Sequence, residues 1–301
     1  MSSPSLPRPW AVHVELVEGC NRLCSFCGLS SMRSRPMEDL KFMEPLLGEQ
    51  LASQLAILAP TARYEFAMHG EPTLHPDYLG MLRIFRRHLP KAQIQLTTNG
   101  RVWMRDLEGE ARRTLRIVDF IALDTYLPER DQLRELAAKL PKSIAVSDFY
   151  ETHLSPYHNY HGKLRNTIIL LDDLSLRSGE HSTRVMTNQA GSNPSRPIPP
   201  SPLAKTCTRP FREMAVCHDG AVTICCNDYL RGLVLGYAPE STLSDLWLGP
   251  KMEAARAFLG QRCRDFLPCS RCDGGSGMRV GLLPKYPPPT KEQIALLKPE
   301  N

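Results

Sequence analysis

Three cysteines near the start of the chain have a spacing that suits an iron–sulfur cluster. Cys20, Cys24 and Cys27 form a C-x3-C-x2-C pattern. One compact loop with this spacing can bring three thiolates to three corners of an iron–sulfur cube, which leaves the fourth iron without a protein ligand. An iron with an open position can bind a small molecule. The alternatives are a closed zinc site, which needs a fourth ligand, and three buried free thiols.

A second set of four cysteines lies far along the chain. Its members are Cys207, Cys225, Cys269 and Cys272, the last two forming a C-x2-C pair. Four thiolates satisfy either a cubane cluster or a zinc ion. Cys226 is an alternative ligand to its neighbour Cys225, and the spacing to the turn residue Gly220 favours Cys225. Cys217 and Cys263 are then expected to be core residues.

The composition is that of a globular protein, and its cysteines are expected to lie in a reducing compartment. The chain has 301 residues, 42% of them hydrophobic, and a net charge of +5. We see no apolar run long enough to cross a membrane, no signal peptide and no nucleic-acid-binding motif. A cytoplasmic location is therefore expected, in which grouped cysteines indicate metal binding rather than disulfides. The mild positive charge would suit an acidic substrate or electron donor, or have no consequence.

Short apolar runs alternate with helical patterns over the first half of the chain, so parallel strands must position the first cysteine set. We expect strands over 12–17, 64–68, 94–97 and 117–123, with further candidates at 143–146 and 168–171, and Val185-Met186 would start or extend the sixth. We expect helices over 43–58, 78–88, 105–115 and 129–140. Strands that alternate with helices predict a parallel sheet. In (β/α) barrels the chemistry gathers at the C-terminal ends of the strands, which is where the first cysteine loop falls.

The predicted fold class is α/β: a partial (β/α)6 TIM-like barrel, followed by a small β-hairpin and helix iron–sulfur domain. We divide the chain into an N-terminal extension (1–10), the partial barrel (11–187), a Pro/Ser-rich linker (188–206), the auxiliary domain (207–278) and a C-terminal tail (279–301). The tail is expected to be extended or partly mobile.

A turn after the second predicted strand resembles a motif of a known enzyme family. The run His69-Gly70-Glu71-Pro72 is similar to the Gly-Gly-Glu-Pro motif of the radical SAM superfamily, with a histidine in place of the first glycine. Together with the cysteine triplet it implies that S-adenosylmethionine (SAM) chelates the open iron, and that Gly70, Glu71 and Pro72 lie at its amino group. A bare Gly-Glu-Pro turn would be generic.

The resemblance extends to three further positions near SAM. Asn99 lies in a Thr-Asn-Gly turn that occurs near the cofactor in the family, and Phe26 occupies a position where an aromatic ring commonly packs beside the adenine. Asp124 resembles the aspartate of a Ser-x-Asp pattern, but Ala122 replaces the serine, so that hydroxyl contact is lost. Asp124 could bind ribose or substrate, or cap the next helix. Ordinary turn and packing roles are the alternatives for the other two.

The second cysteine set resembles the shortened SPASM module, called twitch, of radical SAM enzymes. The resemblance of both modules covers residues 11 to about 275, and it implies two [4Fe–4S] clusters in all. A fully ligated auxiliary cluster has no site for substrate, so its expected role is to accept the electron left on the substrate radical.

We therefore expect reductive cleavage of SAM to a 5′-deoxyadenosyl radical that abstracts hydrogen from a substrate C–H bond, with net oxidation of a small molecule. The reaction needs a one-electron donor such as flavodoxin or ferredoxin. It also needs a base, for which Asp228 is the first candidate and His69 and Tyr126 are the others. A turn role is the alternative for Asp228.

Two other function classes remain open. The first is a peptide- or protein-modifying maturase; a barrel that begins near residue 11 would leave no room for an N-terminal recognition domain, though a partner could supply one. The second is a non-enzymatic metal-binding scaffold, which the SAM-related motifs disfavour. The substrate cannot be identified from the sequence, because the residues that select it lie in loops without a motif.

Overall fold

One mixed sheet of nine strands forms the frame of the protein. The computed structural model describes residues 8–126, 129–148, 164–171, 187–274 and 286–297. The strand order is β11-β10-β9-β1-β4-β5-β6-β8-β7. The strands are β1 (Ala11–Val14), β4 (Arg63–Phe66), β5 (Gln93–Thr98), β6 (Phe120–Asp124), β7 (Ala145–Asp148), β8 (Thr167–Leu171), β9 (Glu213–Val216), β10 (Ala221–Thr223) and β11 (Val234–Tyr237). Strands β9 through β7 in this order pair in parallel, which confirms the predicted α/β fold with a partial barrel.

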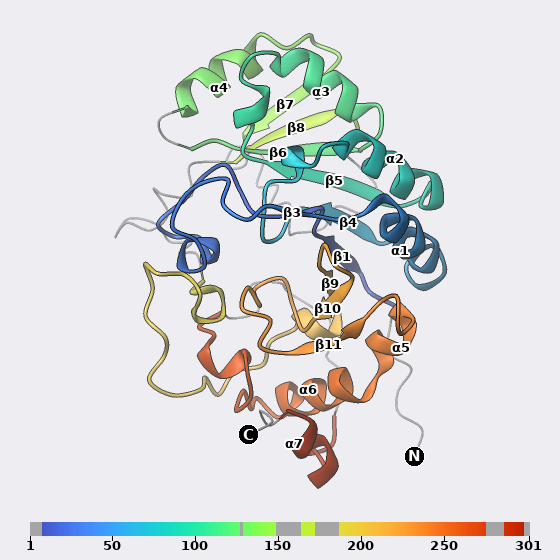
Figure 1. The fold of residues 1–301 in the computed structure, drawn as a ribbon, viewed down its shortest axis with the longest axis vertical. Helices are drawn as coiled ribbons and strands as arrows, with labels where there is room; N and C mark the ends of the chain where they lie inside the picture. Colours follow the sequence, from blue (N-terminus) through green and yellow to red (C-terminus); the bar gives the residue numbers. More distant parts are fainter. Residues whose placement is uncertain (1–7, 127–128, 149–163, 172–186, 275–285, 298–301) are drawn as a thin grey trace.

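Four helices in the first half of the chain connect the parallel strands, and Figure 1 shows them along the outer side of the sheet. They are α1 (Pro45–Leu58), α2 (Tyr78–His88), α3 (Leu107–Leu115) and α4 (Arg130–Ala138). The local signals are strong in α2, where Asp77 caps the N-terminus by accepting a hydrogen bond from Gly80 N at 2.9 Å. Met81, Leu82 and Phe85 form its buried face. The predicted positions of all four helices agree with the structure to within a few residues.

The last two barrel strands depart from the consecutive order that a barrel predicts. β8 lies between β6 and β7, so the strand that comes later in the chain occupies the inner position. Burial explains the exchange: every described residue of β8 is buried, whereas Ala145 and Val146 of β7 are exposed, as suits an edge strand. The pair Val185-Met186, expected in a sixth strand, lies outside the described residues.

The C-terminal cysteine-rich part continues the barrel sheet. β9 pairs in parallel with β1 on the side opposite β4, β10 pairs antiparallel with β9, and β11 pairs antiparallel with β10. Three helices pack below, as Figure 1 shows: α5 (Leu243–Leu248), α6 (Pro250–Gly260) and α7 (Lys291–Leu297). The tail, expected to be extended, therefore contains a helix, because Leu297 is buried against the core and α7 packs on α6.

The stretch 188–206, predicted as a linker, is in part a buried bridge. Asn188 and Gln189 are buried, and Asn188 Nδ2 donates to Arg271 O at 2.7 Å. Gln189 Oε1 accepts a hydrogen bond from Gly28 N at 2.5 Å, next to the first cysteine set. The amide side chains of Asn188 and Gln189 therefore connect the two cysteine-bearing regions. The Pro/Ser-rich composition of the stretch gave no sign of this role.

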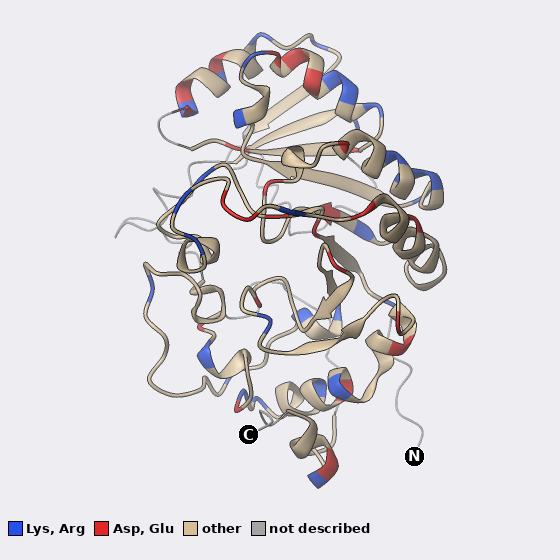
Figure 2. Cartoon of the chain, viewed as in Figure 1, with Lys and Arg blue, Asp and Glu red and all other residues tan. Residues whose placement is uncertain are grey.

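Charged side chains lie mostly on the covering helices and loops, and most of the sheet is uncharged (Figure 2). Among the exceptions are His13 in β1, Glu65 in β4 and Glu213 in β9, all of which are buried. None of the described helices combines the length and the apolar character needed to span a bilayer. The buried charges lie at the floor of the site described next.

Candidate active site

A cavity of about 420 Å³ opens at the C-terminal ends of β1, β4, β5 and β6. All three cysteines of the first set line it, as the barrel rule predicts. On its other walls lie Glu65, Asp124, Arg209 and Cys226, so charged or reactive side chains surround the space beside the cysteine loop. The cavity therefore has room and polar groups for a ligand next to three converging thiols.

Backbone hydrogen bonds hold the cysteine loop against the loop after β4. Gly19 N donates to His69 O at 2.9 Å, and Glu71 N donates to Gly19 O at 2.8 Å. A Cβ atom on Gly70 would lie 1.9 Å from Val17 O, so only glycine allows the two backbones to approach this closely. The predicted turn His69-Gly70-Glu71-Pro72 thus lies beside the first cysteine set. Pro72 is buried at the start of a short 3-10 turn and does not line the cavity.

The carboxylate of Glu71 ties its own turn to the end of β5. Oε1 accepts hydrogen bonds from Thr73 Oγ1 at 2.6 Å and Thr98 Oγ1 at 2.7 Å, and Oε2 accepts from Asn99 N at 2.8 Å. Asn99 in turn donates through Nδ2 to Asn21 Oδ1 at 2.9 Å, within the cysteine loop. Glu71 and Asn99 both line the cavity, and they also fix the end of β5 against the cysteine loop.

The first cysteine set suits the positively charged iron–sulfide core of a cluster. Burial and nearby negative charge raise the pKa of Cys20 to about 12, and burial raises that of Cys27 to about 11. Three thiolates would repel one another in this enclosed place unless positive charge were bound among them. Three soft donors on one loop, with open space in front of them, are the arrangement that a cluster with one free iron requires.

Two aromatic rings form a wall of the cavity. Phe26 and Tyr126 stack with their ring centroids 6.0 Å apart and their planes inclined by 16°. The guanidinium of Arg22 lies over the ring of Tyr126, 4.7 Å from its centroid. Tyr126 Oη donates to Asp124 Oδ2 at 3.2 Å. Phe26, Asp124 and Tyr126 all line the cavity, so this wall offers ring faces and a carboxylate to a bound nucleoside or substrate.

The second cysteine set lines a smaller chamber behind the main cavity. Its four members, Cys207, Cys225, Cys269 and Cys272, all face this chamber. Arg264 lies there as well, almost fully buried, and donates to the carbonyl oxygens of Lys205 at 2.8 Å and Gly274 at 2.6 Å. An iron–sulfide core with four thiolate ligands carries a net negative charge, and the buried cation Arg264 beside these thiols would balance it. These residues therefore fit the auxiliary cluster.

A thin wall separates the chamber from the cavity. Thr187, Arg209 and Asn227 line both spaces. Cys225 faces the chamber, whereas the next residue, Cys226, faces the main cavity. Of these two neighbouring thiols, Cys225 is therefore the one that shares a space with Cys207, Cys269 and Cys272.

Buried charges at the cavity floor are a feature that the sequence analysis did not identify. His13 Nε2 lies 3.2 Å from Glu213 Oε2, and His13 Nδ1 lies 3.6 Å from Glu65 Oε2. Burial alone would lower the pKa of His13, but Cys226, Glu213 and Glu65 raise it to about 10, so the imidazole is protonated. Arg209 Nη1 donates to Glu213 Oε2 at 2.9 Å. The sequence feature that could have identified this floor is the presence of charged residues within otherwise apolar strands.

Two of the three base candidates do not face the cavity. Asp228 accepts hydrogen bonds from Gly232 N at 2.7 Å and Leu233 N at 3.0 Å, so it serves the turn after Cys226. His69 lies behind the wall, with Nδ1 3.0 Å from Glu15 Oε1. Of the three, Tyr126 lines the cavity. Asp228 and His69 are close to cavity residues in the sequence, but their side chains contact the turn after Cys226 and Glu15, respectively.

Two family comparisons agree with this division of the site. Residues 14–140 match the radical SAM superfamily, and residues 207–273 match the iron–sulfur cluster-binding domain SPASM. A similar protein is the S-adenosyl-L-methionine-dependent 2-deoxy-scyllo-inosamine dehydrogenase of Niallia circulans. It is 24% identical over 269 residues, which cover 88% of this chain and 93% of that protein.

Solved structures show the same fold. The crystal structure of BtrN in complex with AdoMet and 2-DOIA has a TM-score of 0.68 at 21% identity, covering 88% of this chain and 93% of that one. BtrN in an open conformation has a TM-score of 0.59 at 19% identity, covering 88% and 92%. At these identities the structural similarity establishes the fold and leaves the residue roles to the geometry above.

Proposed function

Because the chain belongs to the radical SAM superfamily and carries a SPASM iron–sulfur domain, we propose that it oxidises a polar small molecule at a C–H bond. The observation that carries this proposal is the cavity that the first cysteine set lines, which shares the wall residues Thr187, Arg209 and Asn227 with the chamber of the second set. When bound, the first cluster with SAM supplies a radical oxidant for C–H cleavage, and the auxiliary cluster supplies an electron acceptor.

The chain's own residues hold and orient these groups. We assign the first cluster to Cys20, Cys24 and Cys27 and the auxiliary cluster to Cys207, Cys225, Cys269 and Cys272. Gly70 brings the turn after β4 against the first cysteine loop, and Glu71 and Asn99 fix that loop. Phe26, Asp124 and Tyr126 line the cavity, and we assign them to contact SAM or substrate and to exclude water.

Glu65 is our candidate for the group that takes the hydroxyl proton when an alcohol becomes a carbonyl. It lines the cavity, lies 3.4 Å from Arg63 Nη2 and 3.6 Å from His13 Nδ1, and accepts from Thr97 Oγ1 at 3.3 Å. These partners hold a carboxylate in place at the floor. The same charged floor would bind a substrate rich in hydroxyl or amino groups, which is the class that the substrate named for the Niallia circulans relative represents.

The test is anaerobic reconstitution with iron, sulfide, SAM and a one-electron reductant of the flavodoxin or ferredoxin class. We expect about eight irons per chain and formation of 5′-deoxyadenosine, as two cubanes require. Cys24→Ala should lose about half of the iron and all 5′-deoxyadenosine. Cys263→Ala, at a cysteine outside both sets, is the matched control and should retain both.

Wild-type protein that binds about four irons, or that forms no 5′-deoxyadenosine, would contradict the proposal. Substrate class is tested with 2-deoxy-scyllo-inosamine and related polyhydroxylated compounds, by mass spectrometry for a product that has lost two hydrogen atoms. A modified peptide in place of an oxidised small molecule would support a maturase instead.

A further inference from the structure

One arginine beside the second cysteine set is buried without a carboxylate partner. Arg264 is 2% exposed and lines the chamber of that set. Within the described part of the chain, its hydrogen bonds all go to backbone carbonyl oxygens and none goes to an acidic side chain. A charged side chain is rarely buried unless an opposite charge compensates for the lost water. The missing negative charge is therefore expected in the chamber.

The hydrogen bonds of Arg264 fix where its charge lies. Nε donates to Lys205 O at 2.8 Å, and Nη2 donates to Thr206 O at 3.3 Å. Nη1 donates to Gly274 O at 2.6 Å and to Cys272 O at 3.3 Å. The guanidinium thus joins the segment that leads into the second cysteine set to the segment that ends it. Carbonyl oxygens orient the cation, but they carry no net charge that could neutralise it.

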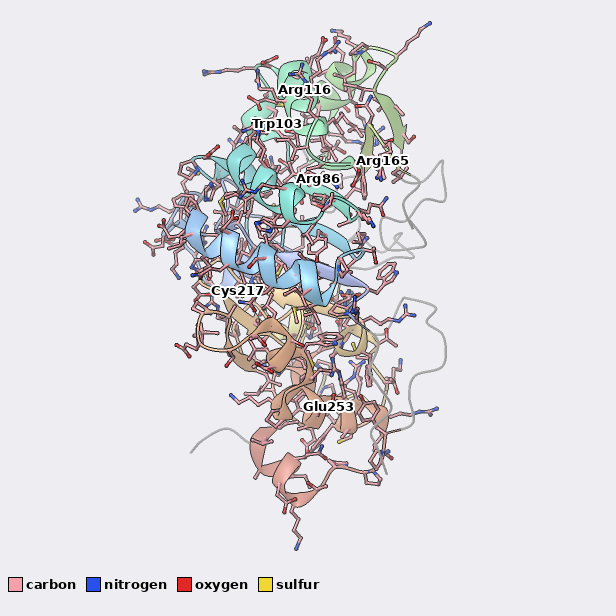
Figure 3. The ribbon with its side chains drawn as sticks, turned by 90° about the vertical axis from the view of Figure 1, so that its right-hand side faces the viewer. Arg86, Trp103, Arg116, Arg165, Cys217 and Glu253 are labelled. Carbon is pink, nitrogen blue, oxygen red and sulfur yellow. The ribbon has the colours of Figure 1, made fainter. Side chains whose placement is uncertain are left out.

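Two other arginines of the C-terminal half have the carboxylate that Arg264 lacks. Arg209 also lines the chamber, and its Nη1 donates to Glu213 Oε2 at 2.9 Å. Arg256 is fully buried in α6, and its Nη1 donates at 2.7 Å to Oε1 of Glu253, which lies in the lower half of Figure 3. For Arg264, the thiolates of the second cysteine set take the place of such a carboxylate.

Arg264 also positions a hydrogen bond to one of these sulfurs. Gly274 N donates to Cys272 Sγ at 3.3 Å, while Gly274 O accepts from Arg264. Net charge, burial and hydrogen bonds to the sulfurs are the features that set the reduction potential of an iron–sulfur cluster. A donor to a ligand sulfur and a nearby cation both stabilise added negative charge, so they act in the same direction.

A cluster with four thiolate ligands gains one more negative charge when it accepts an electron. Burial penalises that charge, and a fixed cation beside it offsets the penalty. We propose that Arg264 is the countercation of the auxiliary cluster and that its charge raises the reduction potential of this cluster. The step it serves is loss of one electron from the substrate radical to the cluster, while Glu65 takes the hydroxyl proton and a carbonyl forms.

This inference rests on the proposed function, and its test needs no substrate. Cys24→Ala is the parent protein, because it should keep the auxiliary cluster alone, at about four irons per chain. Anaerobic redox titration followed by electron paramagnetic resonance gives the potential of that cluster. Arg264→Gln and Arg264→Met in this parent should lower the potential by about 59 mV or more, which is a tenfold smaller equilibrium constant for one-electron reduction.

Two variants separate charge from packing. Arg264→Lys keeps the positive charge but cannot form the same four hydrogen bonds, so its equilibrium constant should stay within about threefold of that of the parent. Arg256→Gln is the matched control, since Arg256 is equally buried but does not line the chamber. Its potential should equal that of the parent.

Unchanged potentials in both neutral variants would overturn the inference. An equal fall in Arg264→Lys would do the same, because the hydrogen bonds alone would then explain the effect. If the neutral variants bind no cluster, iron content decides: iron retained in Arg264→Lys supports the countercation, and loss of iron in all three variants overturns it. A parent protein that does not bind about four irons would instead contradict the proposed function.

Discussion

At the scale of single residues, the site is held by carboxylates whose charge is matched by buried cations. Glu213 is the best placed of them, because it contacts His13 from β1 and Arg209 from the segment before β9. Burial would raise the pKa of Glu213, but Arg209 and His13 lower it from 4.5 to about 2. The pair Glu213 and Arg209 thus joins the cavity floor to the wall that carries Cys226.

This lowered pKa predicts how stability depends on pH. A carboxyl that is more acidic in the folded state stabilises the protein above its unfolded pKa of about 4.5, and this contribution is lost as the pH falls toward 2. A shift of this size corresponds to about 3 kcal/mol in the free energy of unfolding. Urea unfolding of Glu213→Gln should therefore show a weaker loss of stability than wild type between pH 4.5 and 2.

Glu49→Gln serves as the control, since Glu49 forms its ion pairs with Arg87 and His88 on the surface. Its unfolding curve should follow the wild type over the same range, because exposed pairs contribute little. A Glu213→Gln curve parallel to that of wild type would show that Glu213 is not held ionised by its neighbours.

The convergence of Cys20, Cys24 and Cys27 on one cavity could be predicted from sequence, because the three cysteines are closely spaced on one loop. The cavity floor could not be predicted, because His13, Glu65 and Glu213 come from three different strands and meet through the order of the sheet. Asp228 failed for a related reason: its position after Cys226 was evident, but its hydrogen bonds to Gly232 N and Leu233 N depend on how the turn closes.

At the scale of elements, the approach of two loops determines the first site. Gly19 and Gly70 form an isolated parallel bridge, which places the turn after β4 directly against the cysteine loop. The helices were predicted well because capping and apolar spacing are local signals. The inner position of β8 was not, because the choice between β7 and β8 depends on which strand is covered on both faces.

Gly70→Ala tests this approach. The added Cβ would meet Val17 O at 1.9 Å and Gly19 O at 2.6 Å, and these backbone atoms cannot move without displacing the cysteine loop. We expect a loss of about 3 kcal/mol or more in the free energy of unfolding, and weaker binding of iron to the first site, measured by iron content and absorbance.

Gly48→Ala is the matched control, because its added Cβ would meet the flexible end of Met81 at 2.6 Å, and alanine favours the helical conformation there. It should bind iron as wild type does. Iron content in Gly70→Ala equal to that of Gly48→Ala would show that the two loops need not approach so closely.

At the scale of the whole molecule, the two cysteine-bearing parts share one sheet. The parallel ladder of β1 with β9 and the buried bridge at Asn188 and Gln189 join them on two sides. Composition suggested two units with a linker between them, because a Pro/Ser-rich stretch has no local sign of burial. We therefore expect the described parts to unfold together.

Tryptophan fluorescence can test this cooperativity. Trp103 lies in the barrel half, as Figure 3 shows, and Trp247 lies in α5 of the C-terminal half; both are buried. With Trp10, which precedes β1, replaced by Phe in both variants, the fluorescence of Trp247→Phe reports on the barrel and that of Trp103→Phe on the C-terminal half. For each iron-loaded variant, the denaturation midpoints by fluorescence and by circular dichroism should coincide. Separate midpoints in either variant would mean that the halves unfold independently.

The ladder between β1 and β9 has a consequence for how the protein is made. His13 and Glu213 meet although they are 200 positions apart, so β1 stays an open sheet edge until the ribosome has released β9. The strand that leads into the first cysteine set is therefore completed late in synthesis. Iron delivered earlier would meet a cavity that lacks Glu213 at its floor and Cys226 in its wall. We expect nascent chains that stop before residue 207 to depend on chaperones.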